Sequence, residues 1–223
     1  MFRKYLNPEN DLMITLSEIT DILFLSIFWL LGSALVITAG PATAALYDAV
    51  YHGFRLREND SWLRFLRSFR SNFKTGLLAS IPVGAILAVM LWAVTMLLAA
   101  AASEMIPWTV FVAVCFAALL LIGVLAVIFP MLSRFETGVG QLIGNSFRLA
   151  LANLPRTAAL AAIHGLTIFA CVRYVLPLLF LPALCMLVST FLIEPMFRPY
   201  LPEADAAAPE ARQEENSGKI TNS

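Results

Sequence analysis

Long uncharged apolar runs alternate along this chain with short segments that carry nearly all of its Lys and Arg residues. A helix needs about 20 mostly apolar residues to cross the ~30 Å hydrocarbon layer, because its backbone polar groups must all be satisfied within the segment. We assign five such segments: 22–39, 75–103, 105–133, 157–172 and 174–193. They predict an all-α fold, an integral membrane helical bundle of about five transmembrane helices, in a single domain over residues 1–200.

Composition supports a lipid environment for much of the chain, since 60% of the residues are hydrophobic, 13% are charged and the mean hydropathy is +0.80. The net charge is zero, so no attraction to nucleic acid is expected. The fourth segment, 157–172, is short and contains His164, which leaves open whether it fully spans. The tail at 201–223 lacks aromatic residues and is rich in Ala and Glu, so we expect it to be disordered.

The distribution of Lys and Arg predicts the orientation in the membrane, because short cytoplasmic loops are enriched in these residues. Segment 40–74 holds Arg55, Arg57, Arg64, Arg67, Arg70 and Lys74, and segment 134–156 holds three arginines. The opposite side receives only Arg3, Lys4 and Arg173. We therefore expect a multi-pass plasma-membrane protein with its N-terminus outside and its C-terminus in the cytoplasm.

The first cytoplasmic segment predicts an amphipathic helical loop. Pro41 suits the start of a helix through Ala42 to Phe54, and Asn59 or Asp60 suits the cap of a second helix. This second helix combines an aromatic stripe with cations; its candidate interaction or lipid-facing residues are Trp62, Arg64, Arg67, Arg70 and Lys74. Such a helix suits anionic lipid headgroups, and the alternative is a docking surface for a cytoplasmic partner.

Several motifs resemble the YesL-like family of bacterial membrane proteins, a domain of unknown function. They are GPATAALY at 40–47, FRSNFK at 69–74, Phe129-Pro130, Arg134-Phe135 and NLPR at 153–156, and the resemblance covers about residues 1–200. Members of that family often occur beside carbohydrate importers of the ABC type. The resemblance implies a role in carbohydrate uptake and assigns no catalytic residue.

A fainter similarity concerns the loop helix by which ABC permeases contact their ATPase, which has a Glu-Ala-Ala, two residues, Asp-Gly-Ala pattern. Ala44, Ala45 and Asp48 match this pattern, whereas Thr43 and Ala49 replace its Glu and Gly. The departures favour an ordinary Ala-rich amphipathic helix over an ATPase-docking helix.

A weak internal echo relates two stretches that precede predicted spans. Residues 68–75 read SFRSNFKT, and 146–157 repeat SFR and then NLPRT with wider spacing. We interpret the echo as convergent interfacial chemistry, with a duplicated unit as the alternative.

Ionisable groups at membrane depth are costly, so each should face protein or water and have a partner. The candidates are Asp21, Arg134, His164, Arg173 and Glu194. The predicted topology places Asp21 and Arg173 at the same outer level and Arg134 and Glu194 at the same inner level, where either pair could clamp two helices. We interpret His164 as a packed histidine that needs a hydrogen bond from a neighbouring helix, with proton transfer or solute binding as the alternative.

The sequence shows no familiar nucleophile, metal or cofactor motif, and the three cysteines have no metal-ligand spacing. We therefore expect no enzyme, no cofactor and no metal. The leading hypothesis is a membrane accessory or regulatory protein associated with carbohydrate uptake, whose partners are membrane lipids and ABC importer subunits or another membrane protein. The alternative is a transporter or permease-like subunit that moves a small solute itself.

Overall fold

All regular structure in the described part of the chain is helical. The computed structural model describes residues 11–58, 60–135 and 137–201. Its α-helices are α1 (Asp11–Gly32), α2 (Ala39–Val50), α3 (Ser61–Ser71), α4 (Phe73–Ala102), α5 (Trp108–Arg134), α6 (Val139–Ala152), α7 (Leu154–Arg173) and α8 (Leu181–Phe197). Short elements join them: the 3-10 helices η2 (Val36–Thr38), η4 (Leu176–Leu179) and η5 (Arg198–Tyr200), and the π-helix η3 (Tyr51–Arg55) that continues α2. The predicted all-helical class is confirmed; the predicted tail, apart from Leu201, lies outside the described residues.

Within the residues that the structure describes, four helices are long and apolar enough to cross a membrane, as in a multi-pass membrane protein. They are α4, α5, α7 and the stretch Leu181–Tyr200 formed by α8 and η5. The predicted segments 75–103, 105–133 and 157–172 lie within three residues of α4, α5 and α7 at each end. The first predicted segment overlaps α1, which is not among the four, so the described residues support four spans rather than five.

The first and fifth predicted segments differ most from the helices in the structure. Segment 22–39 was expected to be one helix, but α1 begins at Asp11 and ends at Gly32, where an added Cβ would lie 3.2 Å from Cβ of Ala42. The fifth segment was expected to begin at residue 174, but α8 begins at Leu181. Pro177 and Pro182 lack the backbone N–H needed inside a helix, so the chain forms a turn and η4 before α8.

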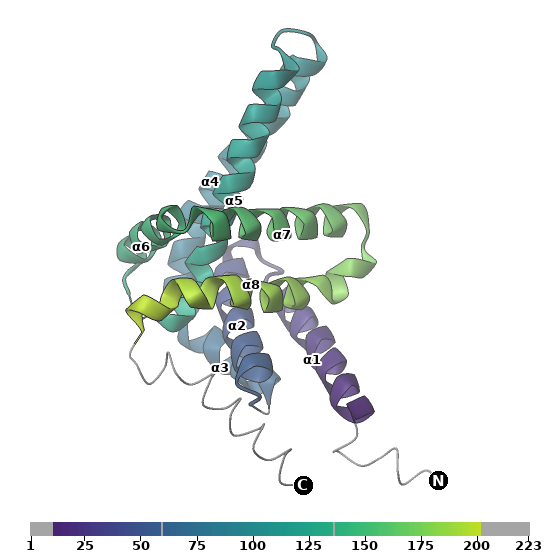
Figure 1. The fold of residues 1–223 in the computed structure, drawn as a ribbon, viewed down its shortest axis with the longest axis vertical. Helices are drawn as coiled ribbons and strands as arrows, with labels where there is room; N and C mark the ends of the chain where they lie inside the picture. The colour runs from purple at the N-terminus through teal and green to yellow at the C-terminus, as the bar shows by residue number, and fades with distance from the viewer. Residues whose placement is uncertain (1–10, 59, 136, 202–223) are drawn as a thin grey trace.

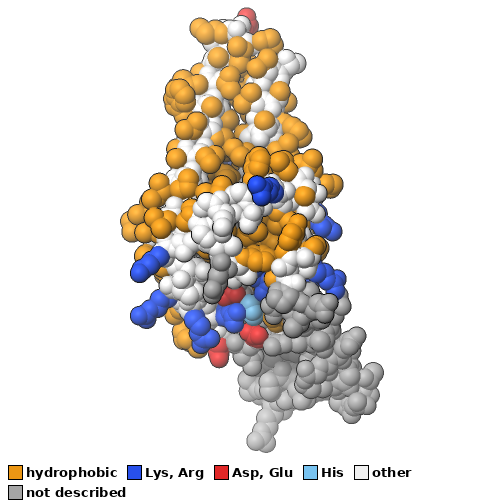
Figure 2. Space-filling view, turned by 90° about the vertical axis from the view of Figure 1, so that its left-hand side faces the viewer, with side chains coloured by type: hydrophobic (Ala, Val, Ile, Leu, Met, Phe, Trp, Pro, Cys, Tyr) orange, Lys and Arg blue, Asp and Glu red, His pale blue; other side chains and the backbone are white. Residues whose placement is uncertain are grey.

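The helices form a body from which one long hairpin projects. Figure 1 shows α4 and α5 side by side in this hairpin, while α7 and α8 run across its base and α1 leans away below them. Outer residues of the hairpin are largely exposed, as expected for side chains that face lipid. Figure 2 shows hydrophobic side chains over the hairpin end of one face, and most of the visible Lys and Arg lower down on the body. The molecule thus separates an apolar hairpin from a charged body.

Helix α2 lies at the centre of the body, in contact with α1, α3, α4, α5 and α8. Ten of its twelve residues are buried. Its Gly40-Pro41 start packs closely on α4: a Cβ at Gly40 would lie 2.7 Å from the carbonyl oxygen of Gly76, and a Cβ at Gly76 would lie 2.9 Å from Cα of Pro41. The Ser80 hydroxyl also accepts a hydrogen bond from the Gly40 backbone N–H at 3.1 Å. Small residues are required here because the two backbones nearly touch.

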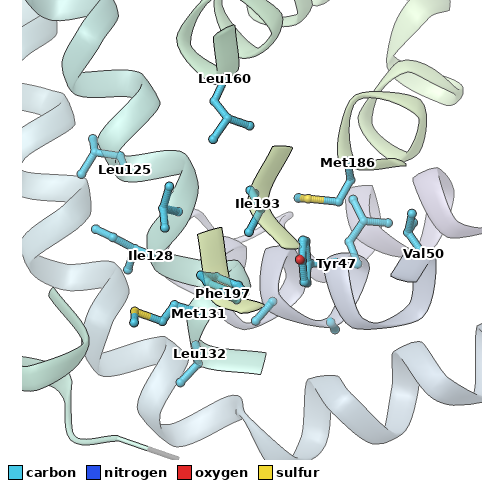
Figure 3. Packing of buried hydrophobic residues seen from close by; sticks show 14 of the residues in the cluster. Tyr47, Val50, Leu125, Ile128, Met131, Leu132, Leu160, Met186, Ile193 and Phe197 are labelled. Atoms are coloured by element: carbon cyan, nitrogen blue, oxygen red, sulfur yellow. The ribbon is translucent and has the colours of Figure 1, made fainter. Parts of the chain in front are cut away.

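The apolar core joins α2 to α5, α7 and α8. Figure 3 shows side chains of α5, including Ile128, facing Ile193 and Phe197 of α8, with Leu160 of α7 above them and Tyr47 of α2 beside them. Ile193, Phe197, Leu160 and Tyr47 are all fully buried. The core therefore holds the crossing helices α7 and α8 against the base of the hairpin.

The internal echo corresponds to two similar helix junctions. Asn72 separates α3 from α4, and Asn153 separates α6 from α7. In each junction the amide Nδ2 donates to the carbonyl four residues earlier, at 3.1 Å for Ser68 and 3.1 Å for Leu149. Each asparagine thus closes a short helix and starts a longer one, which explains its shared position in both stretches.

Candidate functional site: a basic helix joined to a buried polar network

Three exposed cations follow one another along α3 and the start of α4. Arg67 and Arg70 lie on α3 and Lys74 lies at the start of α4, and all three side chains are exposed. Arg67 and Arg70 are three positions apart and so are neighbours on the surface of α3, and Lys74 follows just beyond the break at Asn72. We call these three residues the basic strip. Trp62 lies on the same helix and is 45% exposed.

The predicted aromatic stripe divides between the core and the surface. Phe65 is buried and its ring stacks on Phe28 of α1 with centroids 6.0 Å apart. Phe69 stacks on Phe65 at 6.1 Å and packs against the same apolar core, so both rings attach α3 to the body instead of facing lipid. Trp62 and Leu66 remain exposed. The helix is therefore fixed by its aromatic side while its basic side stays accessible.

Arg64 differs from the other cations of α3 because it turns toward α2. Its Nε donates to Oδ2 of Asp48 at 2.9 Å and its Nη2 donates to Oδ1 at 3.3 Å. Nη2 also lies 2.8 Å from Nε2 of His52, and Nδ1 of His52 lies 3.1 Å from Oδ1 of Asp48. Burial alone would raise the pKa of Asp48, but the hydrogen bonds and charges of His52 and Arg64 outweigh it and lower this pKa below its usual range. Asp48 is thus a carboxylate that attaches α3 to α2.

The candidate interaction residues of α2, Ala44, Ala45 and Asp48, lie inside the body and not on an exposed docking helix. Ala44 and Ala45 are fully buried, and Asp48 is 7% exposed. Asp48 is occupied by its contacts with α3, and the two alanines pack in the core. A helix that binds an ATPase subunit must present these positions to solvent, so the partial match to the ABC pattern does not mark a docking face.

A second polar group lies on the other side of α2. Nη2 of Arg134 in α5 donates to Oε2 of Glu194 in α8 at 3.0 Å, so the structure brings this pair together. The Tyr47 hydroxyl donates to Oε1 of Glu194 at 2.7 Å, and the Arg134 guanidinium lies 4.3 Å from the ring centroid of Tyr51. Burial and the Glu194 charge raise the pKa of Tyr47 well above its usual value, so its hydroxyl remains a donor. This group joins α2, α5 and α8.

The remaining intramembrane candidates do not come together. Arg173 is exposed, with its guanidinium 5.3 Å from the ring centroid of Tyr174, and no ion pair with Asp21 occurs among the described contacts. His164 is partly buried, and its Nδ1 lies 3.0 Å from the carbonyl oxygen of Leu160. This partner belongs to the same helix, so the expected bond from a neighbouring helix is replaced by a local one.

Three contributors to the polar network were missed from the sequence: Tyr47, Tyr51 and His52. A usable signal was the spacing, because Tyr47 and Tyr51 are four residues apart, as are Asp48 and His52, within an otherwise Ala-rich helix. Within the ranges that the structure describes, no group of three or more His, Cys, Asp or Glu residues could hold a metal ion. The chemistry that the network offers is ion pairing and hydrogen bonding between helices.

The fold and this site define a multi-pass helical membrane protein with a basic face on its body. Residues 22–94 match the family model described as "Protein of unknown function, DUF624", so the chain contains a DUF624 domain, that of the YesL-like family. The matched range includes two of the motifs that carried the resemblance, at 40–47 and 69–74, while the motifs at 129–135 and 153–156 lie beyond it. No curated protein and no solved structure matches the chain.

Proposed function

We propose that this protein is a non-enzymatic membrane accessory or regulatory protein of a carbohydrate uptake system, and that it acts through its basic cytoplasmic face. The observation that carries the proposal is the basic strip: Arg67 and Arg70 are exposed on α3, which Phe65 and Arg64 hold to the body, and Lys74 is exposed at the start of α4. Exposed cations on a fixed helix offer a complementary surface to an acidic partner. An exposed Trp beside them adds a side chain that is common in interface hot spots.

The carbohydrate part of the proposal rests on the family. The YesL-like resemblance implies a setting beside ABC-type sugar importers, and importer subunits are therefore the partners that we propose. The cytoplasmic location that we propose for the strip follows from the excess of Lys and Arg in segments 40–74 and 134–156. An N-terminus outside and a C-terminus inside the plasma membrane additionally require α1 to cross the membrane as a fifth span, beside the four spans of the described residues.

The nature of the hairpin groove supports an accessory role over transport. The groove between α4 and α5 has a volume of about 490 Å³ and is lined by residues from 85–94 and 114–121, all of them apolar. A carrier that binds a small polar solute places polar groups or broken helices around a midplane site. A wholly apolar groove suits lipid tails or another helix instead.

Affinity purification from native membranes, followed by mass spectrometry, tests the proposal. We expect importer subunits to copurify with the wild-type protein and to fall about tenfold when Arg67, Arg70 and Lys74 are all changed to Ala, which corresponds to ~1.4 kcal/mol of binding. Two control variants should insert into the membrane as the wild type does. Arg67→Lys with Arg70→Lys keeps the basic strip positive, and Arg148→Ala with Arg156→Ala removes positive charge elsewhere. Both controls should retain the partner.

Two results would contradict the proposal. One is an absence of importer subunits from the wild-type sample. The other is full partner recovery by the triple Ala variant; if that variant also loses affinity for vesicles that contain anionic phospholipid, the strip is a lipid anchor rather than a docking surface.

A further inference from the structure

The side chain of His52 lies between an acid on α2 and a cation on α3. We propose that His52 is a protonation switch that holds Arg64 against α2 when neutral and releases it when charged. The side chains of His52 and Asp48 are 12% and 10% exposed, whereas that of Arg64 is 33% exposed. Arg64 can therefore move toward solvent without opening the apolar core.

The geometry fixes the protonation state of His52 in this arrangement. A guanidinium has only donors, so Nε2 of His52, at 2.8 Å from Nη2 of Arg64, must accept and carry no proton. The other ring nitrogen, Nδ1, then carries the proton and donates toward Asp48, whose backbone oxygen lies at 2.9 Å and whose Oδ1 lies at 3.1 Å. The closed state is thus built around a neutral imidazole with its proton on Nδ1.

If Nε2 took a proton from solvent, the N–H groups and the positive charges of His52 and Arg64 would face each other at hydrogen-bond distance. The two side chains would then repel each other. The charged imidazole would keep its contact with Asp48 and offset the negative charge of that carboxylate, which weakens the attraction between Asp48 and Arg64. The other groups that face the switch are Glu58, whose Oε2 lies 3.7 Å from Nη1 of Arg64, and the ring of Tyr51, edge-on to His52 at 5.2 Å. Glu58 offers the released guanidinium an outer partner.

The pH-dependent release of Arg64 does not come from protonation of Asp48. Its pKa lies below the usual range because of His52 and Arg64, so its carboxylate stays charged across the interval in which imidazoles titrate. Arg64 precedes Arg67 by three positions on α3, so a released Arg64 joins the basic strip as a fourth cation. Only this last consequence, a change in the charge of the docking face with pH, rests on the proposed function.

Hydrogen exchange of the full chain in lipid nanodiscs tests the switch without any partner. The amides of α3 should exchange about two- to tenfold faster at about pH 5.5 than at about pH 8, after correction for intrinsic rates, as expected for the loss of one hydrogen bond. His52→Gln keeps an acceptor for Arg64 and a donor for Asp48 but does not titrate, so its α3 should be protected equally at both pH values. Arg64→Gln should exchange fast at both. Amides of α6 serve as the internal control.

The proposal is overturned if wild-type α3 exchanges equally at the two pH values, if His52→Gln retains the pH response, or if Arg64→Gln still responds. Because the experiment contains no partner, its failure leaves the docking proposal untouched, and a loss of importer recovery would leave the switch untouched.

Discussion

The ion pair between Arg134 and Glu194 should make a large contribution to the stability of the folded protein. Glu194→Gln keeps an oxygen to accept from Tyr47 but removes the negative charge 3.0 Å from Arg134. The two side chains are only 12% and 10% exposed, so water screens the pair weakly. Removing one partner of a buried pair costs about 3–5 kcal/mol, because the other charge is left unpaired. We expect about 3 kcal/mol, since the Arg134 guanidinium keeps its contact with the Tyr51 ring.

A double-mutant cycle with reversible unfolding in detergent measures this effect. Arg134→Gln should also destabilise, but the double variant carries no unpaired charge and should be more stable than the sum of the single effects predicts, by at least ~1 kcal/mol. Arg148→Gln, which changes an exposed cation, should alter the free energy of unfolding by less than about 0.5 kcal/mol. Additive single effects, or a Glu194→Gln change as small as that of Arg148→Gln, would show that the two charges do not stabilise each other.

Three further predictions concern packing, the isolated histidine and topology. Gly76→Ala should lower the yield of folded protein because its Cβ would meet the proline backbone of α2 at 2.9 Å, whereas Gly84→Ala, with open space around it, should not; fluorescence-detected size exclusion compares the two, and equal profiles would argue against the close contact. His164→Leu should change the free energy of unfolding by less than about 1 kcal/mol, because the hydrogen bond of this histidine among the described residues goes to a carbonyl of its own helix; a larger loss in thermal melts would point to an additional partner. Cysteines placed at Ser103 and Arg148 should react with a membrane-impermeant reagent from opposite sides of the membrane, and labelling of both from one side would exclude the predicted orientation of α4 and α5.

The hairpin was predictable because its chemistry is uniform. Long runs without charge define α4 and α5, and their bounds lie within three residues of the predicted segments. The boundaries near α1 and α8 depend on finer signals. Gly32 ends α1 where the chain approaches α2, and the prolines at 177 and 182 delay α8, yet hydropathy alone treats both regions as continuous apolar segments.

The site was predictable in its residue types but not in their partners. The spacing of cations and aromatics placed Arg67 and Arg70 on a helix, and the structure leaves both exposed. Nothing in that spacing separates them from Arg64, which belongs to the same helix and the same run of charges. Only the packing of α3 on α2 brings Arg64 to Asp48, because the relevant contact crosses sixteen positions of sequence.

The polar residues of α2 also show why the DUF624 domain depends on the rest of the chain. The matched range ends at residue 94, yet Tyr47 within it donates to Glu194, and Tyr51 lies beneath Arg134. A chain cut after residue 94 would lose both of these partners together with the α5 and α8 side chains that cover the central helix. Its buried hydroxyl would then be unsatisfied, at a cost of about 1–3 kcal/mol, and its apolar face would be open. We therefore expect that the matched segment does not fold alone, because α5 and α8 complete the environment of its buried polar residues.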